Sequence, residues 1–363
     1  MMKPILGQWE AMGSTLLGVH PERCICVRNK NAHCMRCADV CTTGAIAFNG
    51  EALSLDPERC IGCGTCATAC PTCALEAANP TDRQLSAACA DKLKRAGGAT
   101  LELRCSSNVG NAEGANAAPD VMCMGRLEES LLVELSLRGC EKLVLHTGNC
   151  ETCPHRRGGE LARRVVASAN GLLAAFGRTI DVAVDPRRDF APDQACSQSL
   201  LATRRPTPPA APARFEHVDA AGTLSHHTPS RRARLFKLVE LLGQPQTASI
   251  DTRLWGEAAI DVDACKSCRM CAVFCPTGAL RKVGVIDGRL GVEHRPALCV
   301  QCRLCESVCP AHAITVSSRV SPHKFEDGYF ERIEMRPLDW IPNRADSIWQ
   351  KTAQDIGGNY TVF

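Results

Sequence analysis

Cysteine is the residue type whose number and spacing in this sequence point to chemistry. The chain has 363 residues and 25 cysteines, and four of these fall within residues 299–309, directly before a proline. Cysteines this close together are awkwardly placed to bridge one another, and in an intracellular chain such richness indicates metal binding or redox work before disulfides. The closely spaced thiols therefore predict metal centres.

Four runs of cysteines are present, two near each end of the chain. Both C-terminal runs have the spacing C-x2-C-x2-C-x3-C-P: Cys265, Cys268, Cys271 and Cys275, then Cys299, Cys302, Cys305 and Cys309. This pattern resembles the bacterial-type two-cluster ferredoxin, in which three cysteines of a run hold one cube and the fourth binds the other. The resemblance implies one [4Fe–4S] cluster on Cys265, Cys268, Cys271 and Cys309, and a second on Cys299, Cys302, Cys305 and Cys275.

The N-terminal pair of runs follows the same plan, but one run is irregular. The second run is regular, with Cys60, Cys63, Cys66 and Cys70; the first is stretched, with Cys26, Cys34, Cys37 and Cys41, and has Thr42 in place of the proline. Crossing the fourth ligands again gives one cube on Cys26, Cys34, Cys37 and Cys70, and another on Cys60, Cys63, Cys66 and Cys41. Cys24 competes for the first position of the stretched run, which we assign to Cys26.

Zinc is the alternative metal for these runs, because a single C-x2-C pair is as typical of zinc as of iron. Zinc sites use separated pairs of ligands, however, and not four runs with this spacing. Asn49-Gly50 and Asp287-Gly288 also predict hairpin turns between the runs of each pair, which a ferredoxin-like module needs to fold over its clusters. The sequence therefore predicts four [4Fe–4S] clusters.

The middle segment, residues 81–185, has a different pattern. Predicted helices over 81–97, 125–139 and about 157–176 alternate with predicted strands over 98–106, 141–148 and 179–185. Strands that alternate with helices favour a small α/β domain with a mainly parallel sheet.

Cysteines in this middle segment fall at strand ends and loops. Cys105 closes the first strand, Cys123 precedes Gly-Arg and a helix, and Cys150 and Cys153 follow a strand and precede a Gly-rich helix start. These features resemble the delta subunit of methyl-viologen-reducing hydrogenase. The resemblance implies one [2Fe–2S] cluster on Cys105, Cys123, Cys150 and Cys153. The segment departs from that family because Ser-Ser-Asn follows Cys105 and the spacing near 148–153 is shortened, so a cluster-free domain with buried cysteines is the alternative.

Taken together, these patterns predict a multidomain protein of the α+β and α/β classes, with two dicluster ferredoxin-like modules and one small α/β domain. The expected parts are an N-terminal dicluster module (1–80), a hydrogenase-delta-like α/β domain (81–185), a Pro/Ala/Arg-rich linker (186–230), an amphipathic helix with the C-terminal dicluster module (231–318), and a tail (319–363). The tail carries Trp340 and Trp349, which suit either a docking segment or packing onto the chain's own modules.

Composition narrows the function classes. The formal net charge of +3 is too near neutral to argue for nucleic acid or an anionic membrane, and no run of about eighteen apolar residues is present. The start of the chain does not read as a signal peptide. The richness in cysteine makes the cytoplasm the expected compartment. Basic residues near the N-terminal runs could steer an acidic partner, raise cluster potentials, or form an ordinary solvated surface: Arg23, Arg28, Lys30, Arg36 and Arg59.

No dinucleotide fingerprint, Walker A motif or nucleophile–His pairing is evident in the sequence. We therefore expect a non-catalytic electron-transfer subunit, with the substrate chemistry on another polypeptide. The resemblance of the middle segment implies a catalytic partner of the formate dehydrogenase or hydrogenase type, and a flavoprotein or heterodisulfide-reductase-like acceptor. An iron–sulfur assembly or redox-sensing protein is the main alternative, and an iron–sulfur enzyme with an open iron site is another.

Overall fold

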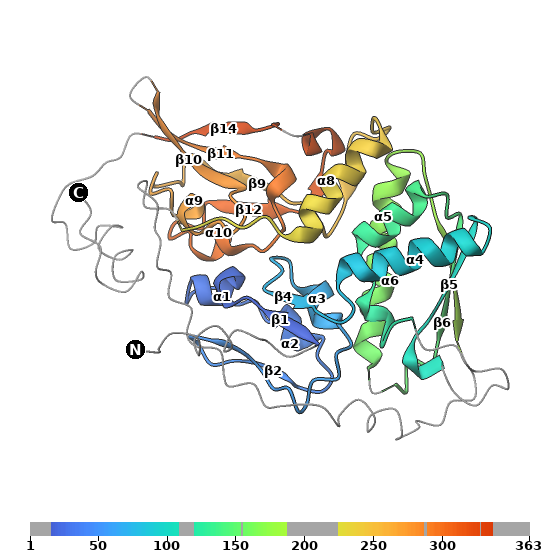
Figure 1. The fold of residues 1–363 in the computed structure, drawn as a ribbon. Helices are drawn as coiled ribbons and strands as arrows, with labels where there is room; N and C mark the ends of the chain where they lie inside the picture. Colours follow the sequence, from blue (N-terminus) through green and yellow to red (C-terminus); the bar gives the residue numbers. More distant parts are fainter. Residues whose placement is uncertain are drawn as a thin grey trace, which may run out of the picture.

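The computed structural model describes residues 16–108, 120–153, 155–186, 224–286, 289–326 and 328–336. In Figure 1 the N-terminal segment (blue), the middle segment (cyan to green) and the C-terminal segment (yellow to red) lie against one another. Most of the expected linker, the Asp287-Gly288 turn and the tail beyond residue 336 lie outside the described residues.

The N-terminal segment is closed by a sheet that joins its two ends. Strand β1 pairs antiparallel with β4, with Leu17 opposite Ala77. Strands β2 and β3 form the hairpin predicted at Asn49-Gly50: Gly50 has a φ of 97°, and the Asn49 side chain accepts a hydrogen bond of 2.8 Å from the Ala52 amide. The elements are β1 (Leu17–Val19), the 3-10 helix η2 (Pro21–Arg23), α1 (Ile25–Arg28), α2 (Arg36–Asp39), β2 (Ile46–Phe48), β3 (Leu53–Leu55), α3 (Thr65–Ala69) and β4 (Leu75–Ala77).

The C-terminal segment repeats this plan. Strand β9 pairs antiparallel with β12, with Ile260 opposite Ile314, and β10 and β11 form the predicted hairpin, to which β14 adds a third strand. The elements are α8 (Ser230–Leu242), β8 (Ile250–Asp251), β9 (Glu257–Ile260), α9 (Met270–Phe274), β10 (Leu280–Ile286), β11 (Arg289–His294), η5 (Pro296–Leu298), α10 (Leu304–Ser307), β12 (Ile314–Ser317), β13 (Arg319–Val320), η6 (Pro322–Phe325) and β14 (Glu331–Glu334).

The middle segment contains the predicted parallel sheet. Its strand order is β5-β6-β7, and both neighbouring pairs run parallel. Thr81 begins the first helix with a capping box, because its side chain accepts from the Gln84 amide while the Gln84 side chain accepts from the Thr81 amide. The elements are α4 (Asp82–Arg95), β5 (Thr100–Arg104), η3 (Ser106–Asn108), η4 (Met124–Arg126), α5 (Glu129–Leu137), β6 (Lys142–Thr147), α6 (Arg156–Ala174) and β7 (Asp181–Pro186).

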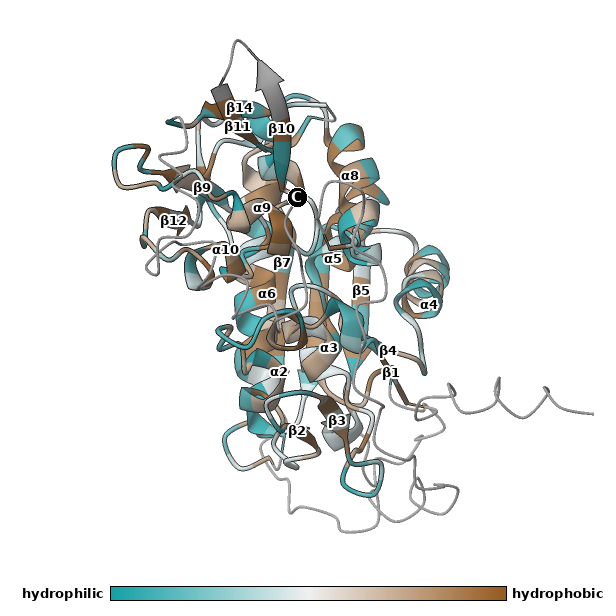
Figure 2. Ribbon diagram, turned by 90° about the vertical axis from the view of Figure 1, so that its left-hand side faces the viewer, coloured by the Kyte–Doolittle hydropathy of each residue, from teal (hydrophilic) through white to brown (hydrophobic). Residues whose placement is uncertain are grey.

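The largest hydrophobic core belongs to the middle segment, but α8 and parts of the C-terminal segment complete it. Leu235 and Leu238 of α8 are buried there, together with Trp255, whose ring stacks on Phe325 with centroids 4.1 Å apart. Figure 2 shows α9, which carries Cys271, as hydrophobic along its length. Among the described helices, none is both long enough and apolar enough to cross a bilayer.

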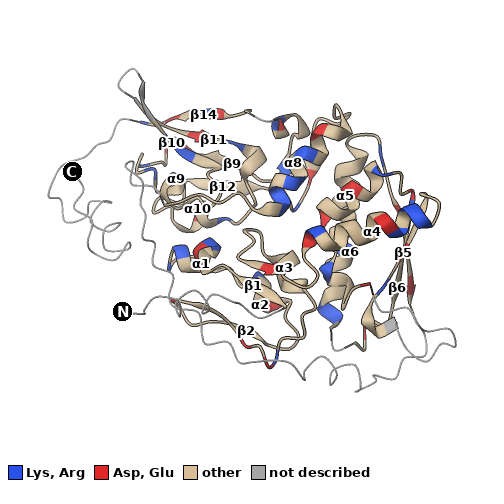
Figure 3. Ribbon diagram, in the orientation of Figure 1, with Lys and Arg blue, Asp and Glu red and all other residues tan. Residues whose placement is uncertain are grey.

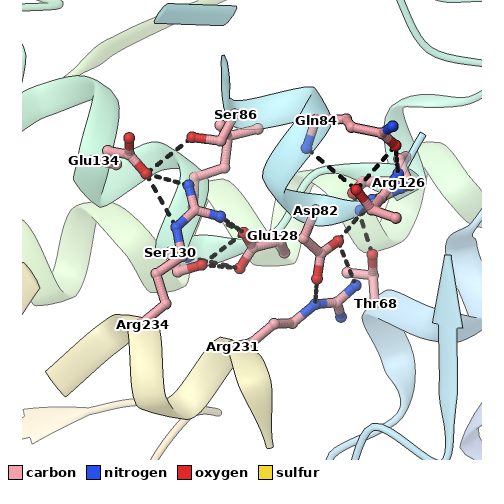
Figure 4. Close-up of polar contacts among 12 residues, drawn as sticks. Thr68, Asp82, Gln84, Ser86, Arg126, Glu128, Ser130, Glu134, Arg231 and Arg234 are labelled. Atoms are coloured by element: carbon pink, nitrogen blue, oxygen red, sulfur yellow. Dashed lines mark hydrogen bonds and ion pairs between the residues drawn. The ribbon is translucent and has the colours of Figure 1, made fainter. Parts of the chain in front are cut away.

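Ion pairs hold α8 against the middle segment. Figure 3 shows basic residues along α8 and acidic residues on the neighbouring α5 and α4. Arg234 Nε donates to Glu134 over 3.0 Å, and the Asp82 carboxylate lies between Arg231 Nε at 2.7 Å and Arg126 Nη2 at 2.6 Å (Figure 4). Burial opposes the charged form of Asp82, but the two arginines outweigh it and hold the pKa of this carboxyl well below its usual value.

We expect Asp82→Asn to lower the free energy of unfolding by about 3 kcal/mol, because it leaves two largely buried guanidinium groups without their carboxylate. Since the pKa of Asp82 is depressed in the folded state, its contribution is fully present above about pH 4 and is lost as the pH falls further. Denaturant unfolding at neutral and acidic pH measures both effects. Asp91→Asn, an exposed site on the same helix, is the control and should stay within about 0.5 kcal/mol of the parent.

Candidate metal centres

The two C-terminal runs bring eight thiols into two groups. Besides burial, the strongest influences that raise the pKa of Cys271 are the thiols of Cys268, Cys265 and Cys309. Burial raises the pKa of Cys305 well above the usual value, and the next strongest influences that raise it are the thiols of Cys302, Cys299 and Cys275. Each group therefore contains three cysteines of one run and the fourth cysteine of the other, the proximity that the crossed arrangement requires.

The N-terminal runs also bring their thiols together. Burial raises the pKa of Cys66, and the neighbouring thiols that add to this are, in order of influence, Cys63, Cys60, Cys37 and Cys41. Burial also raises the pKa of Cys37 to about 12, with Cys70, Cys24 and Cys34 as the thiol neighbours. Crowded thiols of this kind are costly to ionise together unless a bound metal supplies positive charge, so the donor sets fit iron–sulfur cubes.

No three His, Cys, Asp or Glu side chains within the described ranges are placed to hold a single metal ion. A four-iron cube is ligated differently, because each thiolate binds a separate iron atom and the sulfurs stand further apart.

Each of the three regular runs bends the backbone into the left-handed region on both sides of its second cysteine. The residues concerned are Gly62 and Gly64, Ser267 and Arg269, and Gln301 and Arg303, with φ between 51° and 74°. Such conformations are unfavourable for residues other than glycine, and successive backbone N–H groups in these turns form concavities typical of iron–sulfur sites. The strained backbone therefore occurs within the same loops that the cysteine spacing predicts to bind clusters.

Left-handed backbone also follows the fourth cysteine of every run, three residues later. The residues are Gly44, Cys73, Gly278 and His312. The turn directs backbone amides at the fourth sulfur: Ala74 N lies 3.2 Å from Cys70 Sγ, and Ala313 N lies 3.3 Å from Cys309 Sγ. Hydrogen bonds to sulfur are one of the means by which a protein sets the potential of an iron–sulfur centre.

The stretched run differs in its first position. Cys24 ends the 3-10 helix η2 with φ −73° and ψ 125°, and Cys299 ends η5 with φ −71° and ψ 122°. Both amides bond back to a proline carbonyl, Cys24 to Pro21 over 2.9 Å and Cys299 to Pro296 over 3.0 Å. Cys24 thus has the backbone setting of a first cysteine in a regular run.

Cys26, the residue that the sequence favoured for that position, lies inside helix α1 and is buried. Its sulfur accepts a hydrogen bond of 3.2 Å from the Cys34 amide and lies 3.5 Å from the Ala32 carbonyl oxygen. A hydrogen bond between the two thiols raises the pKa of Cys24 and lowers that of Cys26. Cys26 therefore contacts the backbone of the long loop within the stretched run, and the thiols of Cys34 and Cys37 lie near enough to influence its pKa.

The four cysteines proposed for the middle site are also gathered. Burial raises the pKa of Cys123 to about 12, and the thiols of Cys63, Cys105 and Cys153 add to the shift. Burial likewise raises the pKa of Cys150, and its thiol neighbours are Cys105 and Cys153. The middle group therefore adjoins the N-terminal group that contains Cys63.

Glycines at the start of α6 allow this close approach. A Cβ at Gly158 would lie 2.2 Å from Cys123 Sγ, and one at Gly159 would lie 2.9 Å from Cys150 Sγ. The His155 amide donates to Cys153 Sγ over 3.4 Å, while its ring Nδ1 lies 3.3 Å from the hydroxyl of Thr42. The threonine that replaces the expected proline is thus a contact between the N-terminal runs and the middle site.

Contacts between the N-terminal and C-terminal runs were not predicted from the sequence. Arg28 Nε donates to the Phe274 carbonyl over 3.4 Å, and Arg36 Nη2 donates to the Gln301 carbonyl over 2.9 Å. Around them lies a shared hydrophobic cluster that includes Ile25, Ala32, Met270, Val273, Phe274 and Leu304. Two of the five basic residues noted in the sequence therefore face the other cysteine segment.

We expect Gly158→Ala to lower stability by about 1–3 kcal/mol, because the added methyl group overlaps Cys123 Sγ in a packed site. Gly171→Ala on the same helix is the matched control, since its Cβ would meet nothing closer than 4.0 Å. That change should instead stabilise the helix by about 0.5–1 kcal/mol. Anaerobic denaturant unfolding compares the two, and equal stabilities would contradict the close approach at Cys123.

Comparison with known proteins agrees with the cysteine runs. The family described as 4Fe-4S dicluster domain matches residues 11–74 and 264–316. A relative from Proteus vulgaris, a probable iron-sulfur subunit encoded in the Frd operon, is 44% identical over 52 residues, which are 14% of this chain and 33% of that relative. The chain spans about a third of the length of this curated relative. No solved structure matches the chain. The chain thus carries a 4Fe-4S dicluster domain at each end.

Proposed function

We propose that this protein is an iron–sulfur electron-transfer subunit that relays single electrons between an acceptor protein and a catalytic oxidoreductase subunit. The observation that carries the proposal is the contiguity of the thiol groups. Cys123 of the middle group neighbours Cys63, and Arg36 beside Cys37 contacts the backbone next to Cys302. The two dicluster domains and the middle site thus adjoin one another through their cysteine-bearing loops.

The proposed ligand sets follow the thiol groups. The C-terminal cubes are held by Cys265, Cys268, Cys271 and Cys309, and by Cys299, Cys302, Cys305 and Cys275. One N-terminal cube is held by Cys60, Cys63, Cys66 and Cys41, and the other by Cys34, Cys37 and Cys70 with Cys24 in place of Cys26. The backbone match between Cys24 and Cys299 supports this exchange. A [2Fe–2S] cluster on Cys105, Cys123, Cys150 and Cys153 completes the set.

When bound, each cluster takes up and releases one electron. The cysteine side chains would hold the clusters by thiolate bonds, while the backbone donates hydrogen bonds to the sulfurs. The described cysteines are all free of disulfides, as metal ligation requires. The chain works as a conduit in this proposal, and the substrate chemistry belongs to a partner.

The partner classes rest on the resemblance of the middle segment noted in the sequence. A formate dehydrogenase or hydrogenase type of subunit is the proposed electron donor, and a flavoprotein or heterodisulfide-reductase-like protein is the proposed acceptor, in the cytoplasm. These assignments rest on analogy at the level of a domain. Copurification of the tagged chain from its native host under nitrogen tests them.

Redox titration of anaerobically purified protein tests the relay. A protein with these ligand sets contains about eighteen irons, and it should give reversible low-potential paramagnetic signals without losing iron. The assembly alternative expects the opposite behaviour, because a carrier transfers its clusters to an apo-ferredoxin during incubation. Iron that moves to the apo-protein would overturn the relay.

The first ligand of the stretched run is tested by a pair of alanine variants. Cys24→Ala should lose about four irons or leave a three-iron centre, because it removes a thiolate from one cube. Cys26→Ala should retain the iron of the parent, since its sulfur contacts the backbone at Ala32 and Cys34. Iron and acid-labile sulfide counts, with paramagnetic resonance, distinguish the two. Loss of a cube in Cys26→Ala with full loading of Cys24→Ala would return the assignment to Cys26.

A further inference from the structure

A buried arginine lies against one of the two C-terminal thiol groups. Arg232 of α8 is 4% exposed, and its guanidinium stacks over the Trp255 ring at 4.6 Å. Its Nη2 donates to the carbonyl oxygen of Cys299 over 3.2 Å and also contacts the Leu254 carbonyl. Nε and Nη1 have no hydrogen-bond partner in the described structure. The positive charge is therefore held beside a proposed cluster ligand.

This charge is poorly compensated by carboxylates. After the Cys299 thiol, the strongest charge influence on Arg232 is the carboxylate of Glu129. Glu129 is already paired with Arg253, whose Nη2 donates to it over 2.8 Å. Arginine keeps its charge at all ordinary pH values. An anionic centre held on Cys299 would lie next to a full positive charge in a water-poor environment, where Coulomb interactions are strong.

A second buried arginine reaches the same thiol group from the other dicluster domain. Arg28 of α1 is 5% exposed and donates to the Phe274 carbonyl, directly before Cys275. The thiols that interact most strongly with its charge are Cys275 and Cys302. Arg28 and Arg232 therefore approach one group, Cys275, Cys299, Cys302 and Cys305, from two different helices.

The other C-terminal group has a different environment. The strongest influences on Cys268 and Cys271 are burial, their neighbouring thiols and local backbone hydrogen bonds, with no arginine among them. Lys266, next to Cys265 in the sequence, is exposed to solvent. Arg269, next to Cys268, is partly exposed and donates through Nη1 to the Val283 carbonyl over 3.3 Å, so solvent weakens the effect of both charges. The two groups of one dicluster domain thus differ in nearby buried positive charge.

We propose that Arg28 and Arg232 give the site formed by Cys275, Cys299, Cys302 and Cys305 the higher reduction potential of the two in the C-terminal dicluster domain. Taking up one electron makes a cluster one unit more negative, and a buried cation beside it stabilises that reduced state. The electron of this domain then resides at the site that faces the N-terminal domain. The inference rests on the proposed function and adds an internal order to it.

The test is a redox titration followed by paramagnetic resonance on the full-length holoprotein, with dithionite as the one-electron reductant. Arg232→Met removes the charge while keeping a long apolar side chain. We expect the reduction equilibrium of one cluster to shift about tenfold toward the oxidised form. This shift lowers its reduction potential by about 59 mV for a one-electron couple. The signal is assigned to this site by its absence in a Cys302→Ala variant.

Two controls separate charge from structure. Arg232→Lys keeps the positive charge and should therefore keep most of the parent's reduction potential. Arg95→Met makes the same chemical change as Arg232→Met at an exposed position of α4 and should leave every potential unchanged. Arg28→Met, on a different helix, should move the same signal in the same direction. If Arg232→Met does not retain its iron, the potential measured in Arg28→Met becomes the test of the inference.

Unchanged potentials in iron-replete Arg232→Met and Arg28→Met would overturn the inference. So would a shift confined to the signal of the other C-terminal site. Neither result touches the proposed function, which fails when the parent protein lacks iron–sulfur clusters or passes its iron to an apo-ferredoxin. The iron count of each sample keeps the two failures apart.

Discussion

The crowding of thiols in buried, sharply bent loops is the constraint on which the rest of the structure depends. Residues such as Arg269, Gln301 and Arg303 adopt left-handed backbone that costs about 1 kcal/mol or more apiece. The neighbouring thiols of Cys302 and Cys305 are partly buried and close to one another, so their joint ionisation is unfavourable. A bound metal centre offsets both the backbone strain and the crowding of charge. It neutralises the thiolates, and its sulfurs accept hydrogen bonds from the N–H groups of the bent loops.

The packing of the chain keeps these loops together. Helix α8 packs its apolar face into the middle core, and its Arg231 pairs with Asp82, so the C-terminal segment is fixed to the middle segment. Arg28 and Arg36 tie the N-terminal loops to the C-terminal ones. These contacts between segments lie directly between the loops that carry the cysteines. Short separations between redox centres are what a relay of single electrons needs.

Local patterns in the sequence predicted the features that depend on local physics. The cysteine runs, the hairpin at Asn49-Gly50 and the parallel sheet of the middle segment depend on spacing, turn chemistry and the alternation of elements, and the structure contains all three. These features need no knowledge of how distant segments pack.

Features that arise from long-range packing were not predictable in this way. Arg28 and Phe274 are 246 positions apart, and nothing near either residue indicates their contact. The choice between Cys24 and Cys26 depends on the three-dimensional match of Cys24 with Cys299, because an insertion hides the register. A weaker signal did exist for Arg232, which shares the apolar face of α8 with Leu235 and Val239. An arginine at such a position indicates a buried charge with a specific neighbour.

The central claim is that the buried thiol groups hold iron–sulfur cubes, and Mössbauer spectroscopy of protein grown on ⁵⁷Fe and purified without oxygen tests it most directly. The account predicts that about sixteen iron atoms per chain give the parameters of cysteine-ligated [4Fe–4S] clusters. Colourless protein, or protein that contains zinc and no inorganic sulfide, would contradict it.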